Sequence, residues 1–174
     1  MQSIYSIPLK GLKEGNHLYD FKIDSNFFAS FEKSEIHEAE LKAVVSLYKS
    51  SSHTELEIKI TGSVILVCDR CLDPYTQEID TVDRILIKFG EQWEEVNDEV
   101  IILPYGESEF ILDQLIYEFT HLGLPLKKMH PDDEHGRSTC NPDMLKKLKK
   151  HLAQGKGNDD PRWRELEQLK NINN

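Results

Sequence analysis

Two long segments in which hydrophobic and polar residues alternate place the strongest constraint on the fold of this chain. Residues 53–67 carry their large apolar side chains at even positions, namely Leu56, Ile58, Ile60, Val64 and Leu66. Residues 75–89 carry apolar side chains at odd positions, namely Ile79, Ile85, Ile87 and Phe89. Side chains of a β-strand point alternately to its two faces, so each segment is predicted to be a strand with one face in the core.

Four further segments are predicted to be strands. The longest, residues 36–49, is joined to the strand at 53–67 by a turn of three serines, Ser50 to Ser52. The shorter ones are residues 3–10, 19–23 and 99–103, the last closed by Pro104. Consecutive strands with short polar turns between them favour an antiparallel meander.

Four segments carry the pattern of a helix. Asp24 or Ser25 can cap a short helix that carries Phe27, Phe28 and Phe31. A second helix is predicted to begin at Ser108 or Asp113, to lie on one face of the sheet, and to end at Gly123-Leu124-Pro125. Asn141-Pro142 and Asp160-Pro161 each combine a capping residue with a proline at the first helical position, so two helices are predicted at the C-terminus, with a flexible linker at 154–158.

These elements predict an α+β fold, in which a mainly antiparallel sheet that can curl toward a barrel is covered by one packed helix. Residues 1–140 are expected to form this α+β domain, and residues 141–174 a C-terminal helical extension. A chain of 174 residues is long enough to bury a substantial core. No apolar run is long enough to span a bilayer, and the N-terminus lacks the pattern of a secretory signal. A cytoplasmic location with reduced thiols is therefore expected.

Charge is distributed unevenly along the chain. The net charge is −10, yet residues 143–174 carry eight basic and five acidic side chains. The acidic body should repel phosphate, which argues against nonspecific nucleic-acid binding through it. The candidate binding residues are Arg70, Lys146, Lys147, Lys149, Lys150, Arg162, Trp163 and Arg164. Two alternatives stay open: the lysines form a solvated helix face, and Trp163 packs on the domain or on a neighbour.

The sequence Cys68-Asp69-Arg70-Cys71 is the most informative local feature. A Cys-x-x-Cys turn at the end of a strand points two sulfurs into one space, as tetrahedral zinc requires. The third cysteine, Cys140, and a histidine would complete a Cys3His site. His130 is the preferred fourth ligand and His135 the second choice. With four protein ligands the zinc would be structural. The alternative is a set of reduced cysteines in a packed turn.

Catalytic patterns are weaker. A thioredoxin-like thiol redox role needs the Cys-x-x-Cys pair at a helix N-terminus, whereas strands flank it here. The sequence has no Gly-rich phosphate loop, no G-x-S-x-G and no H-E-x-x-H. A noncatalytic protein without a small-molecule substrate is therefore expected.

The order of these motifs resembles the YceD-like family, the large ribosomal RNA subunit accumulation protein, long classed as a domain of unknown function. The resemblance rests on the segment Val67 to Pro74, on Leu112-Asp113-Gln114-Leu115 and on Leu122-Gly123-Leu124-Pro125, and it covers about half the chain. It implies a cytoplasmic factor of bacterial or plastid type, linked to synthesis, processing or accumulation of large-subunit ribosomal RNA and so to ribosome biogenesis.

The resemblance brings no established catalytic activity. It implies large-subunit ribosomal RNA or ribosomal assembly proteins as partners, and no membrane. Some members follow the Leu-Pro element with a cysteine-rich segment that looks like the second half of a metal site; in this chain His130 stands where those cysteines begin. Three hypotheses remain: a noncatalytic ribosome-biogenesis factor, a thiol redox protein that uses Cys68 and Cys71, and a general protein-interaction module.

Overall fold

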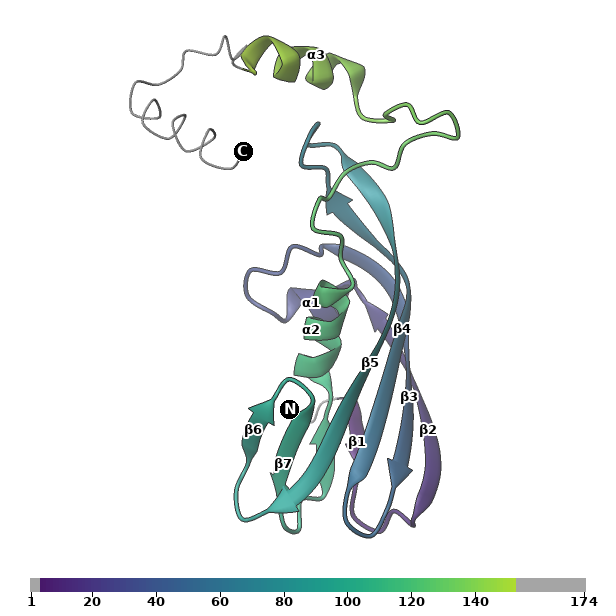
Figure 1. The fold of residues 1–174 in the computed structure, drawn as a ribbon, viewed down its shortest axis with the longest axis vertical. Helices are drawn as coiled ribbons and strands as arrows, with labels where there is room; N and C mark the ends of the chain where they lie inside the picture. Colours follow the sequence, from purple (N-terminus) through teal and green to yellow (C-terminus); the bar gives the residue numbers. More distant parts are fainter. Residues whose placement is uncertain (1–3, 153–174) are drawn as a thin grey trace, which may run out of the picture.

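A computed structural model describes residues 4–152, which form one large open sheet, a small two-stranded sheet and three helices (Figure 1). The large sheet has the order β2-β3-β4-β5-β7-β6, and β1 pairs with β8. The strands are β1 (Ser6–Pro8), β2 (Gly15–Asp24), β3 (Glu38–Lys49), β4 (Thr54–Val67), β5 (Pro74–Gly90), β6 (Glu94–Asn97), β7 (Val100–Pro104) and β8 (Glu109–Ile111). The helices are α1 (Ser25–Ala29), α2 (Asp113–Leu122) and α3 (Pro142–His151).

The β4–β5 hairpin forms the longest continuous strand pairing in the sheet. It pairs without a break from Thr54 opposite Ile87 to Val67 opposite Pro74, and β2 and β3 continue the antiparallel order on one side. The predicted α+β class is confirmed, and so are the strands expected at 36–49, 53–67 and 75–89 to within two residues at their ends. The sheet is open, and the expected closure toward a barrel is not observed among the described residues.

One face of the sheet carries the core, and the other faces solvent. The alternating residues of β3, β4 and β5 bury side chains such as Leu47, Ile58 and Ile87, and α2 packs over them with Ile116 and Phe119. The opposite face bears cross-strand ion pairs: Lys42 with Asp20, Lys59 with Asp80, and Arg84 with Glu57. Charged pairs keep this uncovered face in water.

The expected antiparallel meander is wrong at β7, which runs parallel to β5. The chain leaves β5, forms β6 at the edge of the sheet, and returns as β7 in the position between them. The reason lies in composition, because all four residues of β6 are exposed whereas Ile101 and Leu103 of β7 are buried. The apolar strand takes the inner position, and the acidic strand takes the edge.

The helix caps follow the sequence predictions. The Asp24 side chain accepts hydrogen bonds from the first turn of α1, and the Asn141 side chain does the same for α3, with Pro142 at its first position. Of the two starts proposed for the central helix, Asp113 is observed, because residues 109–111 pair with β1 instead. The predicted linker at 154–158 and the helix after Pro161 lie outside the described residues. No helix of the described part is long and apolar enough to cross a membrane.

Candidate metal centre

The Cys-x-x-Cys turn, residues 68–71, forms the tip of the β4–β5 hairpin. The backbone N–H of Leu72 donates to the carbonyl of Cys68 (2.9 Å), and the N–H of Cys68 donates to the carbonyl of Asp73 (3.0 Å). Leu72 adopts a left-handed backbone conformation with φ of 63°. These contacts close the tip tightly and bury both Cys68 and Cys71.

A segment far along the chain runs beside this tip. After α2 ends, the N–H of Asp69 donates to the carbonyl of Lys128 (2.7 Å), and the N–H of Lys128 donates to the Asp69 carboxylate (2.9 Å). Lys128 also forms an ion pair with Glu35. This pairing places His130, two residues later, against the turn, where its ring packs beside that of Tyr75.

A compact loop returns the chain to the same place. The Asp133 carboxylate accepts hydrogen bonds from the backbone N–H groups of His135 (2.9 Å) and Arg137 (2.8 Å), and the Thr139 hydroxyl donates to the carbonyl of Pro131 (2.7 Å). Cys140 follows and is buried. The next residue, Asn141, donates from its amide to the Asp73 carboxylate (3.0 Å), so the start of α3 is tied to the hairpin tip.

Four ligand atoms meet at this junction. One atom from each of Cys68, Cys71, His130 and Cys140 lies within 4.8 Å of all the others. The Cys68 and Cys140 sulfurs are 3.7 Å apart, and the Cys71 sulfur is 3.4 Å from His130 Nδ1. The structure thus brings together the preferred ligand set, with His130 rather than His135 in the fourth place.

The spacing fits a tetrahedral zinc ion. Zinc–sulfur bonds of about 2.3 Å in a tetrahedron put two sulfurs about 3.8 Å apart and a sulfur and an imidazole nitrogen about 3.6 Å apart. A disulfide would instead need its sulfurs at about 2.05 Å, and all three cysteines are free thiols. Three buried cysteines and the half-buried His130 would leave no open coordination position on the ion, which is the arrangement of a structural centre.

The surroundings lower the pKa of the Cys68 thiol and raise the pKa of the Cys140 thiol. Burial raises the pKa of the Cys68 thiol, but hydrogen bonds from the backbone N–H groups of Cys71 and Arg70 and contacts with His130 lower it by more, to about 6. A hydrogen bond with Ser138 lowers the pKa of Cys140, whereas burial and the adjacent Cys68 and Cys71 sulfurs raise it by more in total. A thiolate at Cys68 is the form that binds a metal ion.

Apart from Arg70, which lies in the Cys-x-x-Cys turn itself, the other described candidate residues lie outside the cluster. Arg70 is half-buried in the Cys-x-x-Cys turn, and His135 is exposed on the loop. The exposed lysines of α3 are Lys146, Lys147, Lys149 and Lys150, of which Lys146 pairs with Asp143 (3.1 Å). In Figure 1, α3 lies beyond the hairpin tip, at the opposite end of the molecule from β6 and β7. Arg162, Trp163 and Arg164 lie outside the described residues.

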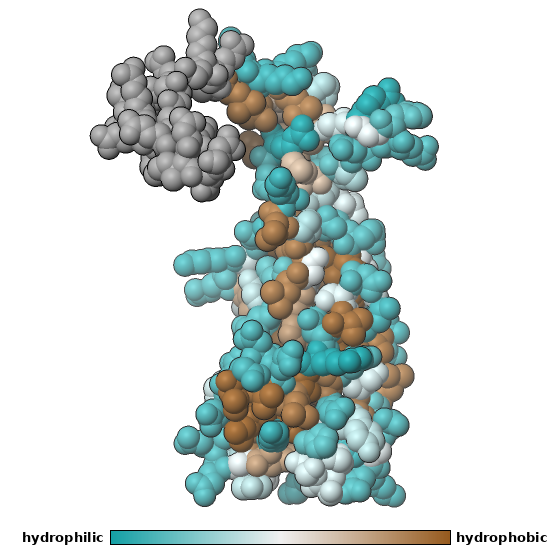
Figure 2. Space-filling model, viewed as in Figure 1, coloured by the Kyte–Doolittle hydropathy of each residue, from teal (hydrophilic) through white to brown (hydrophobic). Residues whose placement is uncertain are grey.

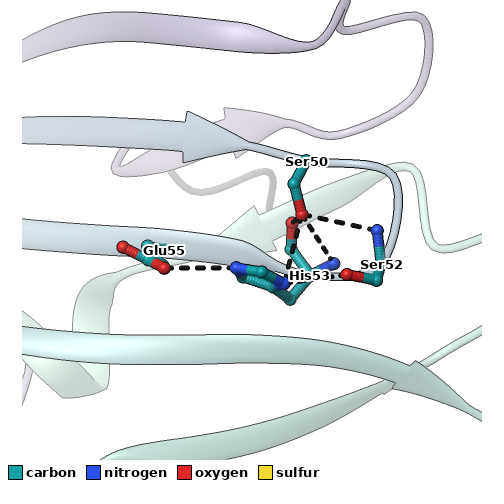
Figure 3. Close-up of polar contacts among 4 residues, drawn as sticks. All are labelled: Ser50, Ser52, His53 and Glu55. Carbon is teal, nitrogen blue, oxygen red and sulfur yellow. Dashed lines mark hydrogen bonds and ion pairs between the residues drawn. The ribbon is translucent and has the colours of Figure 1, made fainter.

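A chain of serine, histidine and glutamate side chains, which the sequence analysis missed, lies in the β3–β4 turn (Figure 3). The Ser52 hydroxyl is 2.9 Å from His53 Nδ1, and His53 Nε2 is 3.1 Å from the Glu55 carboxylate. Ser50 explains the arrangement, because its hydroxyl donates to the carbonyl of His53 (2.9 Å) and accepts from the His53 N–H (3.2 Å). We interpret these contacts as the hydrogen bonds of a tight hairpin turn.

The fold and the junction define an α+β protein in which a buried Cys3His cluster joins a hairpin tip to the start of a basic helix. The sequence profile of the family described as large ribosomal RNA subunit accumulation protein YceD matches residues 56–170. Because this match spans more than half of the chain, the protein belongs to that family. The family description supports a ribosome-related role in general terms. No curated protein and no solved structure matches the chain significantly.

Proposed function

We propose that this protein is a noncatalytic, cytoplasmic factor of ribosome biogenesis that supports synthesis, processing or accumulation of large-subunit ribosomal RNA in bacteria. The family description supports the link to ribosomal RNA. The proposal of a noncatalytic role rests on the position of the Cys3His cluster, whose three cysteines are buried and whose four residues join three chain segments. Such a centre organises a binding surface rather than a reaction site.

In this proposal Cys68, Cys71, His130 and Cys140 hold a structural zinc ion. The ion would cross-link the hairpin tip, the segment after α2 and the start of α3, and it would supply no chemistry beyond this cross-link. The hydrogen bond from Asn141 to Asp73 links α3 to the tip independently of the metal. The centre would therefore fix the direction in which α3 leaves the domain.

Direct contact with RNA is proposed for the exposed lysine face of α3. Lys147, Lys149 and Lys150 form no ion pair within the described part of the chain, so their charges are free to neutralise phosphates. Lysines on an exposed helix bind the RNA backbone without reading its sequence. The acidic sheet domain behind them would keep this contact local.

The deciding experiment compares a deletion strain with strains that carry wild-type protein or a Lys147→Glu, Lys149→Glu, Lys150→Glu variant. We expect the deletion to lower the ratio of large-subunit to small-subunit ribosomal RNA, and we expect the wild-type protein to co-sediment with large-subunit precursors in sucrose gradients. The triple variant should retain zinc but co-sediment less, and its remaining binding should depend less steeply on salt, because fewer phosphates are neutralised. Unchanged ribosomal RNA and gradients in the deletion strain would refute the proposal.

The lowered pKa of Cys68 favours thiol redox exchange as a second candidate function. In that case metal-free protein treated with oxidised glutathione would form a Cys68–Cys71 disulfide and release two molecules of reduced glutathione. Mass spectrometry after rapid alkylation follows the reaction. A rate no greater than that of a free cysteine at neutral pH would exclude the redox function.

A further inference from the structure

A groove with an apolar floor and an acidic rim lies between α2 and the β5–β7–β6 edge of the sheet. Its floor is formed by Ile85, Ile101, Leu115 and Phe119. Its rim carries five carboxylates: Asp83, Glu95, Asp98, Glu99 and Glu118. We call this feature the acidic groove. It belongs to the part of the molecule remote from α3, where Figure 2 shows hydrophobic side chains gathered among polar ones.

Arg84 also lines the acidic groove but is paired with Glu57, so the negative charge of the groove is not compensated within the described part of the chain. None of its five carboxylates forms an ion pair there, whereas Asp20, Asp80 and Glu57 on the outer face of the sheet pair with Lys42, Lys59 and Arg84. Asp83 accepts a hydrogen bond from the Thr81 hydroxyl and Glu118 one from the Gln114 amide, both neutral donors. Negative charge gathered over an apolar floor favours a cationic, amphipathic ligand.

The floor and walls supply apolar area that water still reaches. Leu122 and Leu115, which line the groove on α2, remain accessible, since Leu122 is 73% exposed and Leu115 is only partly buried, whereas Phe119 on the same helix is 6% exposed. An apolar stripe on a partner would cover these side chains and gain hydrophobic free energy in proportion to the area removed from water. Long lysine and arginine side chains at the margins of such a stripe would reach the carboxylates of the rim.

We infer that the acidic groove binds a basic amphipathic helix of another protein, with leucine-like residues on one face and lysine or arginine on its flanks. The five carboxylates repel RNA and anionic lipid, so a protein segment is the occupant. Proteins that bind RNA carry such cationic segments, and an acidic groove would cover one before it reaches its RNA. This inference goes beyond the proposed function, which would stand on RNA contact through α3 alone.

The test uses the full chain, a fluorescent amphipathic peptide of about 18 residues with leucine on one face and lysine and arginine on the other, and a scrambled peptide of the same composition. Binding is measured by fluorescence anisotropy at low and physiological salt. We expect the amphipathic peptide to bind at least about tenfold more tightly than the scrambled one, and its affinity to fall as salt screens the rim.

Matched variants locate the binding. Asp98→Lys with Glu118→Lys changes the rim, whereas Glu32→Lys with Glu107→Lys changes exposed carboxylates elsewhere by the same charge. The rim pair should weaken peptide binding about tenfold and the control pair less than about twofold. Leu122→Ser should weaken it severalfold without a change in charge, and circular dichroism checks that each variant is folded.

Three results would overturn the inference. Equal weakening by both charge pairs would mean that the peptide responds only to the overall charge of the protein. Equal binding of the scrambled peptide would remove the role of the apolar stripe. Concentration-dependent association of the protein alone, abolished by the rim pair in sedimentation equilibrium, would identify a second copy as the occupant. None of these results bears on the ribosomal RNA ratio of the deletion strain, so this inference and the proposed function can fail separately.

Discussion

At the scale of single residues, two histidines provide a direct test of the metal centre. His130 has its Nδ1 atom 3.4 Å from the Cys71 sulfur, whereas His135 is exposed on the same loop and lies outside the cluster. We expect protein purified without a metal-affinity tag to contain about one zinc ion per chain. His130→Ala and Cys140→Ser should each lose most of it, and His135→Ala should retain it. Elemental mass spectrometry on matched preparations measures this difference.

Zinc retained in Cys140→Ser as in the wild type would exclude the Cys3His centre. If the His135→Ala protein lost zinc and the His130→Ala protein retained it, the fourth ligand would be His135. The two histidine variants remove the same ring from the same loop, so a general effect on folding cannot imitate the expected pattern.

The pH dependence of zinc binding follows from the Cys68 thiol. Because the pKa of Cys68 is lowered to about 6, this candidate ligand is a thiolate above that pH and would bind zinc without releasing a proton. Below about pH 6 zinc must displace that proton, so affinity should fall with decreasing pH and the slope of log affinity against pH should steepen by at least about one proton. Cys140, whose pKa is raised, releases its proton on both sides of this point. Competition with a chelator across the pH range measures the slope, and a constant slope through pH 6 would contradict this assignment.

At the scale of the elements, Gly62 sets the path of β4. It lies in the middle of the strand with φ of +135°, and a β-carbon there would be 2.2 Å from the Glu40 carbonyl oxygen of β3. Gly62→Ala must therefore force the two strands apart, and we expect it to lower the free energy of unfolding by more than about 2 kcal/mol. Gly123→Ala is the control, because Gly123 has an ordinary φ of −72° and its nearest neighbours are at 3.4 Å.

Urea unfolding followed by circular dichroism compares the two glycine variants. The control should change the free energy of unfolding by no more than about 0.5 kcal/mol. Equal stability of Gly62→Ala and the wild type would show that β3 and β4 are less closely paired at this point than the structure has them.

Elements whose local pattern is strong could be predicted from the sequence, and those chosen by packing could not. The Asp24 and Asn141 side chains cap residues within three positions of themselves, so the sequence alone predicts these helix starts. Long alternation of apolar and polar residues likewise predicted β3, β4 and β5. By contrast, β6 and β8 have four and three residues and become strands only because β7 and β1 lie beside them. The parallel pairing of β5 with β7 depends on the same choice of neighbours.

At the scale of the whole molecule, the candidate site combines a local motif with a distant one. Cys68 and Cys71 are neighbours in one turn, which made the first half of the site predictable. Cys140 and His130 reach that turn only because α2 runs along the sheet toward the hairpin tip and the chain then pairs Lys128 with Asp69. The acidic groove was not predicted, since its carboxylates come from β5, the β6–β7 region and α2 and meet only in the folded protein.

The contrast between the packed sheet and the sparsely packed segment after α2 predicts how the protein should respond if the proposed zinc ion is removed. The core of the sheet is held by fully buried side chains such as Leu47, Ile58 and Ile60, none of which is a candidate ligand. Residues 126–152, by contrast, bury only Cys140 completely, with Met129, Met144 and Leu145 partly covered. At such a junction the free energy of metal binding contributes to the folding of the segment that carries the ligands. Removing the ion should therefore release this segment and leave the sheet folded.

Hydrogen exchange followed by mass spectrometry, on the full chain with and without a zinc chelator, tests this prediction. We expect faster exchange at the Cys-x-x-Cys turn and at residues 126–152, and unchanged protection in β3, β4 and the middle of β5. Cys140→Ser should reproduce the pattern without chelator, which separates metal loss from any other effect of the chelator. Unchanged exchange at residues 126–152 would mean that the hydrogen bonds of Asp69 and Asn141 suffice to hold the junction, and loss of protection throughout would mean that the sheet itself depends on the metal. Only selective release places α3, and any RNA contact it makes, under the control of zinc.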